Sequence, residues 1–338
     1  MALSTGLENV TAALNREKPK RIPTFEWSVH PSVMSGIAGH ADIFRFTEEM
    51  DLDGVVIYED MEKKWINNDS YIDEWGVTQA MAGADYPTAV AYPIKNPEEL
   101  ENIHIPDPHA AHRFETLKQA VRRFKGKRAI LFRLRDAYSL PRNLRGMENL
   151  MMDYVLQPEL VHRLIDISIT YYTEMAYHAM EIGADIFWTS DDYCDNRGPT
   201  MGPDTWREFI LPGLRKLVKI IRHEGSPFIK HNDGNITEIL PDMVESGISC
   251  IDPIDTGAGM DLERVKGEYG SKIAIKGGVP LDVLVNGTVQ EMRRTVAGCI
   301  EIAGADGGYI CSSASDITGA VKPENYKAMV DTVKETKV

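Results

Sequence analysis

The stretch IFWTSDDYCDNRGPTMGPDTWREFILPGLRKLVKIIRHEGSPFIKHNDGNI, residues 186–236, decides the fold that we expect. It opens with a short apolar run, continues into an amphipathic segment that begins just after Pro203, and closes with a second apolar run. Proline is a common residue in the first turn of a helix. A strand, a long helix and another strand in this order form a βαβ unit, so the two strands are expected to be parallel.

The same alternation extends over the rest of the chain. Eight short runs, mostly apolar, are predicted strands, as expected where both faces of a sheet are covered: 22–26, 54–58, 129–134, 185–189, 227–231, 249–252, 272–276 and 307–311. Predicted helices occupy 4–16, 159–182, 204–223, 236–246, 289–303 and 323–336. We therefore expect an α/β fold in which residues 1–338 form a single (β/α)8 TIM barrel. Residues 59–128 are predicted to be an insertion after the second strand, folded over the barrel mouth.

The composition limits which binding partners and which cellular compartment are expected for this protein. The 338 residues contain 37 Lys and Arg against 51 Asp and Glu, a net charge of −14. This balance argues against nucleic acid or an anionic membrane as the main partner. The four cysteines are widely spaced and no run of about 18 apolar residues occurs, so we expect neither a disulfide framework nor a membrane span. The start of the chain does not have the pattern of a signal peptide. A cytoplasmic protein is expected.

Polar residues gather where the predicted strands end. Chemistry in barrels of this kind takes place at the carboxyl ends of the strands, so these side chains are expected to face one another. The candidate residues are Glu26, His30, Glu59, Asp60, Arg133, Arg135, Asp191, Asp192, Cys194, His231, Asp233 and Lys276. Carboxylates brought together in this way repel one another unless a cation or a proton lies among them.

A metal ion is the simplest cation for this position. His231 and Asp233 alternate along an extended segment, so both side chains can point the same way. Together with Asp191 or Cys194 from the neighbouring strand, they predict a zinc site with an open position. Two other interpretations stay open: His231 can be a hydrogen-bonded histidine that orders its loop, and Asp233 can cap the next helix.

Arg133 and Arg135 share one face of the third predicted strand. A buried arginine needs an acidic partner or an anionic ligand, so these two residues are candidates to hold a substrate carboxylate. Glu26, His30 and Lys276 join them as candidate substrate-binding residues. Asp192, Glu59 and Asp60 are candidate catalytic residues, although such acids are also common in solvated loops.

Several motifs in the right order carry a family resemblance. Residues 186–236, DEWG at 73–76, LRGMENLMMD at 144–153, KGGVP at 276–280 and GGYICSSASDITGAVKPENYKAMV at 307–330 resemble the uroporphyrinogen decarboxylase superfamily. The resemblance covers nearly the whole chain. It implies a (β/α)8 barrel, in agreement with the eight predicted strands.

The superfamily contains two chemistries. Its decarboxylases carry an RQAGRY motif after the first strand, and its arginines hold substrate carboxylates; here residues 26–36 read EWSVHPSVMSG. Asp60 matches the aspartate that contacts the pyrrole nitrogens in those enzymes. Ser315 stands where they have a histidine near the last strand. Decarboxylation of a porphyrinogen is therefore disfavoured.

The other branch consists of cobalamin-dependent methyltransferases. Those that act on thiols bind zinc through His-x-Cys and a later cysteine, where this chain has His231, Asp233 and Ser315. The resemblance implies a component that moves a methyl group from a small methylated substrate to a separate corrinoid protein, and barrels of this type often form homodimers. The harder donor set suits a methyl ether, as in an O-demethylase, with Asp192 or Glu59 as general acid. The alternatives are a decarboxylase-like lyase acting on a carboxylated substrate and a non-catalytic binding subunit.

Overall fold

In the computed structural model, which describes residues 4–81 and 86–337, seven parallel strands form one sheet. The order across the sheet is β1-β6-β7-β10-β11-β12-β13. Their bounds are β1 Gly54–Ile57, β6 Ala129–Leu134, β7 Ile186–Ser190, β10 Phe228–His231, β11 Cys250–Ile254, β12 Ala274–Val279 and β13 Tyr309–Ser313. Seven of the eight predicted strands are therefore confirmed, and the α/β class with them.

The first predicted strand, at 22–26, is not a strand in the structure. This segment still lies between the two edges of the sheet, because Cys311 donates its N–H to Pro23 and Asp53 donates to Thr24. Side-chain acceptors take the place of further backbone hydrogen bonds between strands. The N–H of Thr24 donates to the Asp53 carboxylate at 2.9 Å, and the N–H of Ser313 donates to Glu26 at 3.1 Å. Pro23 has no N–H to offer. A regular eighth strand is therefore absent here.

The sheet is curled around a small apolar interior. One cluster of buried side chains joins Val56 of the first edge strand to Ile310 of the last and includes Trp188 from the middle of the sheet. Helix α1 (Gly6–Leu14) contributes Val10 and Leu14 to the same cluster and contacts β1, β6 and β13. Because both edges of the sheet meet α1, this helix closes the amino-terminal end of the interior.

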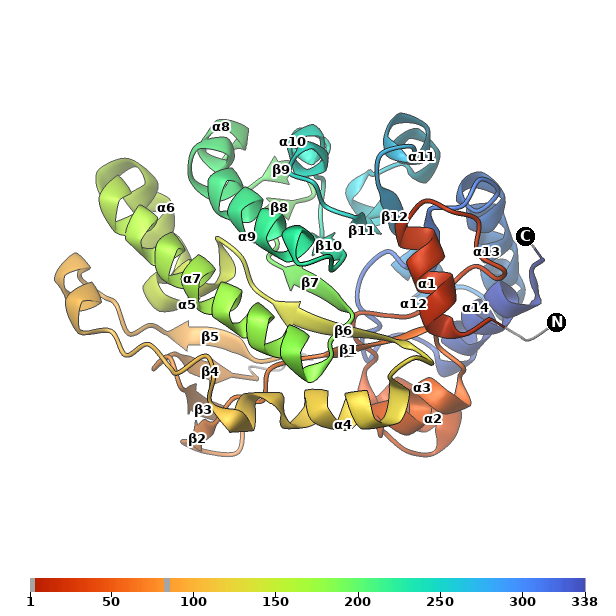
Figure 1. Ribbon diagram of the computed structural model, residues 1–338, viewed down its shortest axis with the longest axis horizontal. Helices are drawn as coiled ribbons and strands as arrows, with labels where there is room; N and C mark the ends of the chain where they lie inside the picture. Colours follow the sequence, from red (N-terminus) through yellow and green to blue (C-terminus); the bar gives the residue numbers. More distant parts are fainter. Residues whose placement is uncertain (1–3, 82–85, 338) are drawn as a thin grey trace.

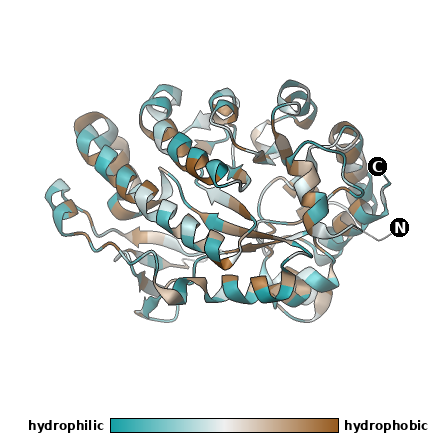
Figure 2. Cartoon of the chain, in the orientation of Figure 1, coloured by the Kyte–Doolittle hydropathy of each residue, from teal (hydrophilic) through white to brown (hydrophobic). Residues whose placement is uncertain are grey.

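The remaining helices lie around the outside of the sheet (Figure 1). They are α2 Pro31–Ala38, α3 Ile43–Glu49, α4 Glu115–Phe124, α5 Ser139–Arg145, α6 Met147–Leu156, α7 Pro158–Ile182, α8 Pro203–Thr205, α9 Leu211–His223, α10 Leu240–Glu245, α11 Leu262–Tyr269, α12 Leu281–Asn286, α13 Val289–Ala303 and α14 Pro323–Glu335. Figure 2 shows the strands mostly in the hydrophobic colour, whereas α4 alternates between the two colours. Such amphipathic helices bury one stripe and expose the other. No helix of the described ranges has the length and apolar character needed to cross a membrane.

A second, antiparallel sheet follows β1. Its strands, in the order β2-β3-β4-β5, are Lys63–Trp65, Ser70–Asp73, Thr78–Ala80 and Thr88–Ala91. Short 3₁₀ helices at Pro97–Asn102 and Ala111–Phe114 then lead into α4. Buried Arg113 links this segment to the sheet, because it pairs with Glu74 beyond β3 and, at 3.2 Å, with Glu59 beyond β1. The small sheet therefore lies at the carboxyl end of β1. Residues 82–85, inside the predicted insertion, lie outside the described residues.

Candidate active site

The polar residues of the site lie next to the apolar interior, toward the carboxyl ends of the strands. Along a strand, every second side chain points to the same face, so the residues two positions after the interior residues extend the same column. After Val56, Leu131, Trp188, Ile229, Cys250 and Ala274 in the interior come Tyr58, Arg133, Ser190, His231, Asp252 and Lys276. Polar residues at one level of six neighbouring chain segments thus meet at the carboxyl end of the sheet.

His231 and two acids that follow the same strands form a candidate metal centre. Asp192, His231 and Asp233 each present a ligand atom, and these atoms lie within 4.8 Å of one another. His231 Nε2 is 3.7 Å from Asp192 Oδ1 and 3.8 Å from Asp233 Oδ1. The loop is fixed locally, because the N–H of Asp233 donates to Asp192 Oδ1 at 3.0 Å. Asp192 comes from the loop after β7, and the other two come from the end of β10.

Asp252 and Trp27 fix the orientation of the His231 imidazole. Its Nδ1 lies 2.6 Å from Asp252 Oδ2, and the other oxygen of Asp252 accepts a 2.8 Å hydrogen bond from Lys276. Trp27 stacks on the His231 ring at 5.4 Å with 15° between the planes. With Asp252 on Nδ1, the free nitrogen Nε2 faces the two other acids. A carboxylate on the far nitrogen is the usual support of a metal-binding histidine.

The electrostatics of the centre favour a positive charge. Burial alone would lower the pKa of His231, but Asp233 and Asp252 outweigh it and raise that pKa well above its usual value. Burial alone would raise the pKa of Asp252, but Lys276 and His231 lower it. Burial, joined by the like charge of Asp233, raises the pKa of Asp192. A cation among Asp192, His231 and Asp233 relieves this repulsion between carboxylates.

The residues present fit a divalent metal ion. Asp233 Oδ1 is buried and has no hydrogen-bond partner among the described residues. A buried oxygen without a partner is costly, and coordination to a metal would satisfy it. One imidazole and two carboxylates make a hard donor set with no thiolate, which suits zinc in a catalytic site or another hard divalent ion. Three protein ligands would leave a position open.

Asp191 and Cys194, two of the predicted metal ligands, lie outside this group of three. Asp191 Oδ2 accepts backbone N–H groups from Asp136, Tyr138 and Ser139 at 2.8–3.1 Å, so it anchors the loop after β6. Burial raises the pKa of the Cys194 thiol to about 12, which disfavours the thiolate that metal binding needs. Asp192, predicted as an acid, stands instead among the three groups that could hold a metal.

Arg133 lies in β6, and Arg135 lies just past the carboxyl end of this strand. Arg133 Nε donates to Ser190 Oγ at 2.6 Å, and the guanidinium lies over the rings of Tyr58 at 4.9 Å and Trp27 at 5.8 Å. Arg135 makes no hydrogen bond or ion pair with the described residues. Neither arginine has an acidic partner within the described part of the chain.

Glu59 and Asp60, predicted as catalytic residues, are both engaged with the protein. Glu59 accepts hydrogen bonds at 3.2 Å from Arg113 and from the Tyr171 hydroxyl. Burial raises its pKa, although Arg113 opposes the shift. Asp60 accepts from the N–H and the hydroxyl of Thr116 at 2.7 and 2.6 Å, and so caps the start of α4. Their contacts are those of residues that position the segment between β1 and α4.

Glu26 and His30 lie on the segment that runs past β13 toward α2. Glu26 accepts from the N–H and the hydroxyl of Ser313, and burial raises its pKa to about 7 against the effect of Lys276. His30 caps α2, because its Nδ1 accepts from the N–H of Ser32 at 3.2 Å. Lys276 belongs to the support of His231. The predicted substrate-binding residues therefore do not form one cluster.

Three residues of the site have no role in the sequence-based prediction. Trp27 stands next to Glu26 and was not assigned a role, although it stacks on His231. Asp252 ends a predicted strand, and only the pairing of β10 with β11 places it opposite His231. Burial raises the pKa of Asp316 to about 7, and His231, Asp233 and Asp192 act on it electrostatically. The SSASD sequence after β13 was the available signal for Asp316.

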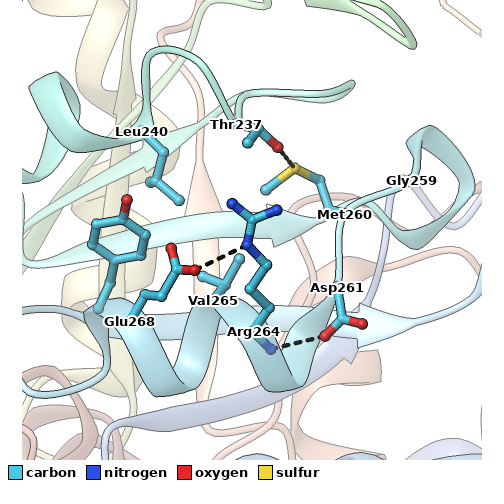
Figure 3. Close-up of a pocket in the computed structure, with 9 residues that line it drawn as sticks. Thr237, Leu240, Gly259, Met260, Asp261, Arg264, Val265 and Glu268 are labelled. Atoms are coloured by element: carbon cyan, nitrogen blue, oxygen red, sulfur yellow. Dashed lines mark hydrogen bonds and ion pairs between the residues drawn. The ribbon is translucent and has the colours of Figure 1, made fainter.

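One cavity lies beside the site, and a second, smaller pocket lies elsewhere. An apolar cavity of about 260 Å³ lies along β1 and is lined by residues of α2 and α3 and by Trp27, Tyr58, Asp60 and Thr116. Figure 3 shows a smaller pocket of about 40 Å³ between α10 and α11, where Arg264 pairs with Glu268. The small pocket contains none of the candidate residues, so it is not part of the site.

Comparison with known proteins finds related sequences. The family described as Uroporphyrinogen decarboxylase (URO-D) matches residues 70–336. A methylated-thiol–coenzyme M methyltransferase of Methanosarcina mazei is 27% identical over 218 residues, which are 64% of this chain and 56% of that protein. A uroporphyrinogen decarboxylase of Chlorobium phaeobacteroides is 27% identical over 187 residues, 54% of this chain and 51% of that protein. The chain thus spans about half the length of the curated relatives it matches.

The fold has a solved counterpart. A methyltransferase from Methanosarcina mazei superposes with a TM-score of 0.81 at 18% identity, covering 98% of this chain and 99% of that one. At this level of identity the likeness establishes the architecture alone.

Proposed function

Because the chain belongs to the uroporphyrinogen decarboxylase (URO-D) family, which includes more than one chemistry, we propose that it is a methyltransferase component. In this proposal it moves a methyl group from a small methylated substrate, in particular a methyl ether, to a corrinoid carried by a separate protein. The observation that carries the proposal is the Asp192–His231–Asp233 group with Asp252 and Lys276 behind it. The methyltransferase relative supports it.

Each part of the site has a task in this proposal. Asp192, His231 and Asp233 would hold a divalent metal, zinc in the first instance, and a bound metal supplies Lewis-acid stabilisation of negative charge on the departing oxygen. Asp252 and Lys276 keep Nε2 of His231 turned toward the metal position. Transfer breaks the bond between the methyl carbon and the oxygen, and the released oxygen then needs a proton. Asp316, a partly buried carboxyl whose raised pKa lets it hold a proton, is the proposed donor.

We also propose that residues 1–338 form one closed (β/α)8 barrel in which 22–26 takes the place of the eighth strand and 59–128 is an insertion. Backbone hydrogen bonds from Cys311 and Asp53 to either side of this segment support closure. A closed barrel would place Trp27 beside His231 as one wall of the site.

Methyl transfer to free cobalamin tests the proposal. Purified protein is incubated with reduced cobalamin and methylated substrates, and the visible spectrum reports alkylation of cobalt. We expect a metal-dependent reaction that His231→Ala abolishes, with metal content near one equivalent by mass spectrometry. Asp204→Asn, which alters an exposed acid on α8, serves as the control. Full activity at less than a tenth of an equivalent of metal contradicts the metal role.

Decarboxylation is the second candidate, because relatives named as uroporphyrinogen decarboxylases match the chain. Against it, Asp60, the residue at the position of the decarboxylase aspartate, is bound to Thr116. Formation of coproporphyrinogen from uroporphyrinogen, measured by chromatography after oxidation, would favour this candidate over methyl transfer.

A further inference from the structure

The buried cationic side chains of the described residues are paired with acids, whereas two partly exposed arginines at the site are not. Four cationic side chains that are buried have partners: Arg113 with Glu59 and Glu74, Arg145 with Asp153, Lys230 with Asp136 and Lys276 with Asp252. Arg133 and Arg135 have no acid within ion-pair distance in the described residues. A guanidinium that is largely removed from water and has no acid is costly, and an anionic ligand would satisfy it.

The two arginines are also partly accessible. The other residues of β6 are buried, and Arg133 alone in this strand is partly exposed; Arg135, just past the strand, is partly exposed as well. Only one nitrogen of Arg133 is used, by Ser190, so both Nη atoms remain available. The guanidinium is kept in place by the rings of Tyr58 and Trp27. An anion would thus meet donors that are already oriented.

Trp27 links these arginines to the candidate metal centre. It lies 5.8 Å from the guanidinium carbon of Arg133 and 5.4 Å from the His231 ring. A small molecule lying against Trp27 can therefore reach both. The charge of the surroundings suits a single negative charge, because the carboxylates of Glu59 and Asp191 already act on Arg135.

We propose that Arg133 and Arg135 bind the carboxylate of the substrate, so that the substrate class is a methylated carboxylic acid whose methyl-bearing oxygen lies toward His231. This inference rests on the proposed function, since it names the substrate of the same site. The bidentate fit between guanidinium and carboxylate supplies orientation as well as affinity.

Binding without turnover tests the inference separately from methyl transfer. Titration calorimetry at neutral pH, with no methyl acceptor present, compares 4-methoxybenzoate and methoxyacetate with their neutral amides. We expect at least one acid to bind and its amide to bind roughly tenfold more weakly or worse. Arg133→Met and Arg135→Met should each reduce the affinity for the acid by a similar factor and leave the amide unchanged. Arg197→Met, on an exposed loop, is the matched control.

Stability gives a second measurement. Without ligand, Arg135→Met should unfold at the same or a higher urea concentration than the parent, whereas Arg113→Met, which leaves Glu59 and Glu74 unpaired, should unfold at a lower one. Equal binding of acid and amide, no binding of either acid, tighter binding of methyl phosphate, or a strongly destabilised Arg135→Met protein would overturn the inference. Acid binding without any methyl transfer would leave it standing and remove the proposed function instead.

Discussion

His231 illustrates how one residue of this site depends on others that are distant in the sequence. Its ring is fixed by Asp252 on the next strand, by Lys276 behind Asp252 and by Trp27 from the other side of the site. A histidine that binds metal through Nε2 needs its proton on Nδ1, and the Asp252 carboxylate holds that proton in place. The support is therefore as much part of the centre as the ligands themselves.

Replacing Asp252 with Asn tests this support. The variant keeps the shape of the side chain but no longer offers a carboxylate to His231 and Lys276, so we expect zinc affinity to fall roughly 10- to 100-fold. Competition with a chromophoric chelator measures the affinity, and circular dichroism checks that the fold is retained. Asp204→Asn on the surface should leave the affinity unchanged. An unaltered affinity in folded Asp252→Asn would contradict the role of Asp252.

Glu26 gives the protein a pH dependence of stability with a defined sign. Burial raises its pKa from 4.5 to about 7, so between these values the folded state holds a proton that the unfolded state has lost. The contribution of Glu26 is therefore present below pH 4.5 and is lost as the pH rises toward 7, about 3 kcal/mol in all.

Glu26→Gln should remove this dependence. Relative to the parent, its free energy of unfolding should increase by up to about 3 kcal/mol between pH 5 and pH 8. Urea denaturation at both pH values gives the difference, in which the effects of all other groups cancel. Glu301→Gln, an exposed residue of α13, should show the same small difference at both values. A constant offset for Glu26→Gln would mean that Glu26 is ionised throughout.

At the scale of elements, the start of a helix can depend on a side chain from a distant part of the sequence. Helix α4 has no capping residue of its own, and Asp60 from beyond β1 accepts from Thr116 in its first turn. Helix 204–223, expected to be continuous, contains a π-helical turn at Trp206–Ile210. Pro212 follows this turn and has no N–H to donate to the carbonyl four residues earlier, which disfavours a regular α-helix there.

Asp60→Ala tests the cap. The change leaves the N–H of Thr116 without its partner, so we expect the free energy of unfolding to fall by about 1 kcal/mol. Asp69→Ala, in the exposed turn between β2 and β3, is the control and should stay within a few tenths of a kcal/mol. Chemical denaturation measures both. If the two variants were equally stable, the contact of Asp60 with α4 would carry no stability.

At the scale of the whole molecule, the two edges of the parallel sheet are joined through segment 22–26 by Asp53. Its buried carboxylate accepts from the N–H of Thr24 at 2.9 Å, from Arg21 at 2.8 Å and from Asn9 of α1 at 3.4 Å. One side chain thus ties the segment, the helix that closes the interior and the start of β1 together.

Asp53→Ala should weaken this junction. We expect a loss of about 2 kcal/mol in the free energy of unfolding, because a buried N–H is left without an acceptor. Hydrogen exchange should accelerate at Thr24 and at the amide of Cys311. Asp53→Asn keeps an acceptor for Thr24 and should lose less. Unchanged exchange at these amides in Asp53→Ala would show that the edges are held together by other contacts.

The sequence by itself determined the repeating units of this protein. Short apolar runs such as 129–134 can be buried on both faces only in a covered sheet, and helices between them make neighbouring strands parallel. From that rule alone, His231, Asp192 and Arg133 could be placed at the same edge, where the structure has them. Local composition also marked Asp233, through its alternation with His231.

Only the tertiary structure decided how these residues divide into roles. Asp191 and Asp192 are adjacent in the chain, yet one binds three backbone N–H groups and the other faces His231. The register of β10 with β11 places Asp252 opposite His231. In segment 22–26, side-chain hydrogen bonds to the carboxylates of Asp53 and Glu26 take the place of strand pairing. Such pairings depend on distances across the fold. A sequence pattern predicts which side chains lie at the same edge of the sheet, but it does not predict which of them are in contact.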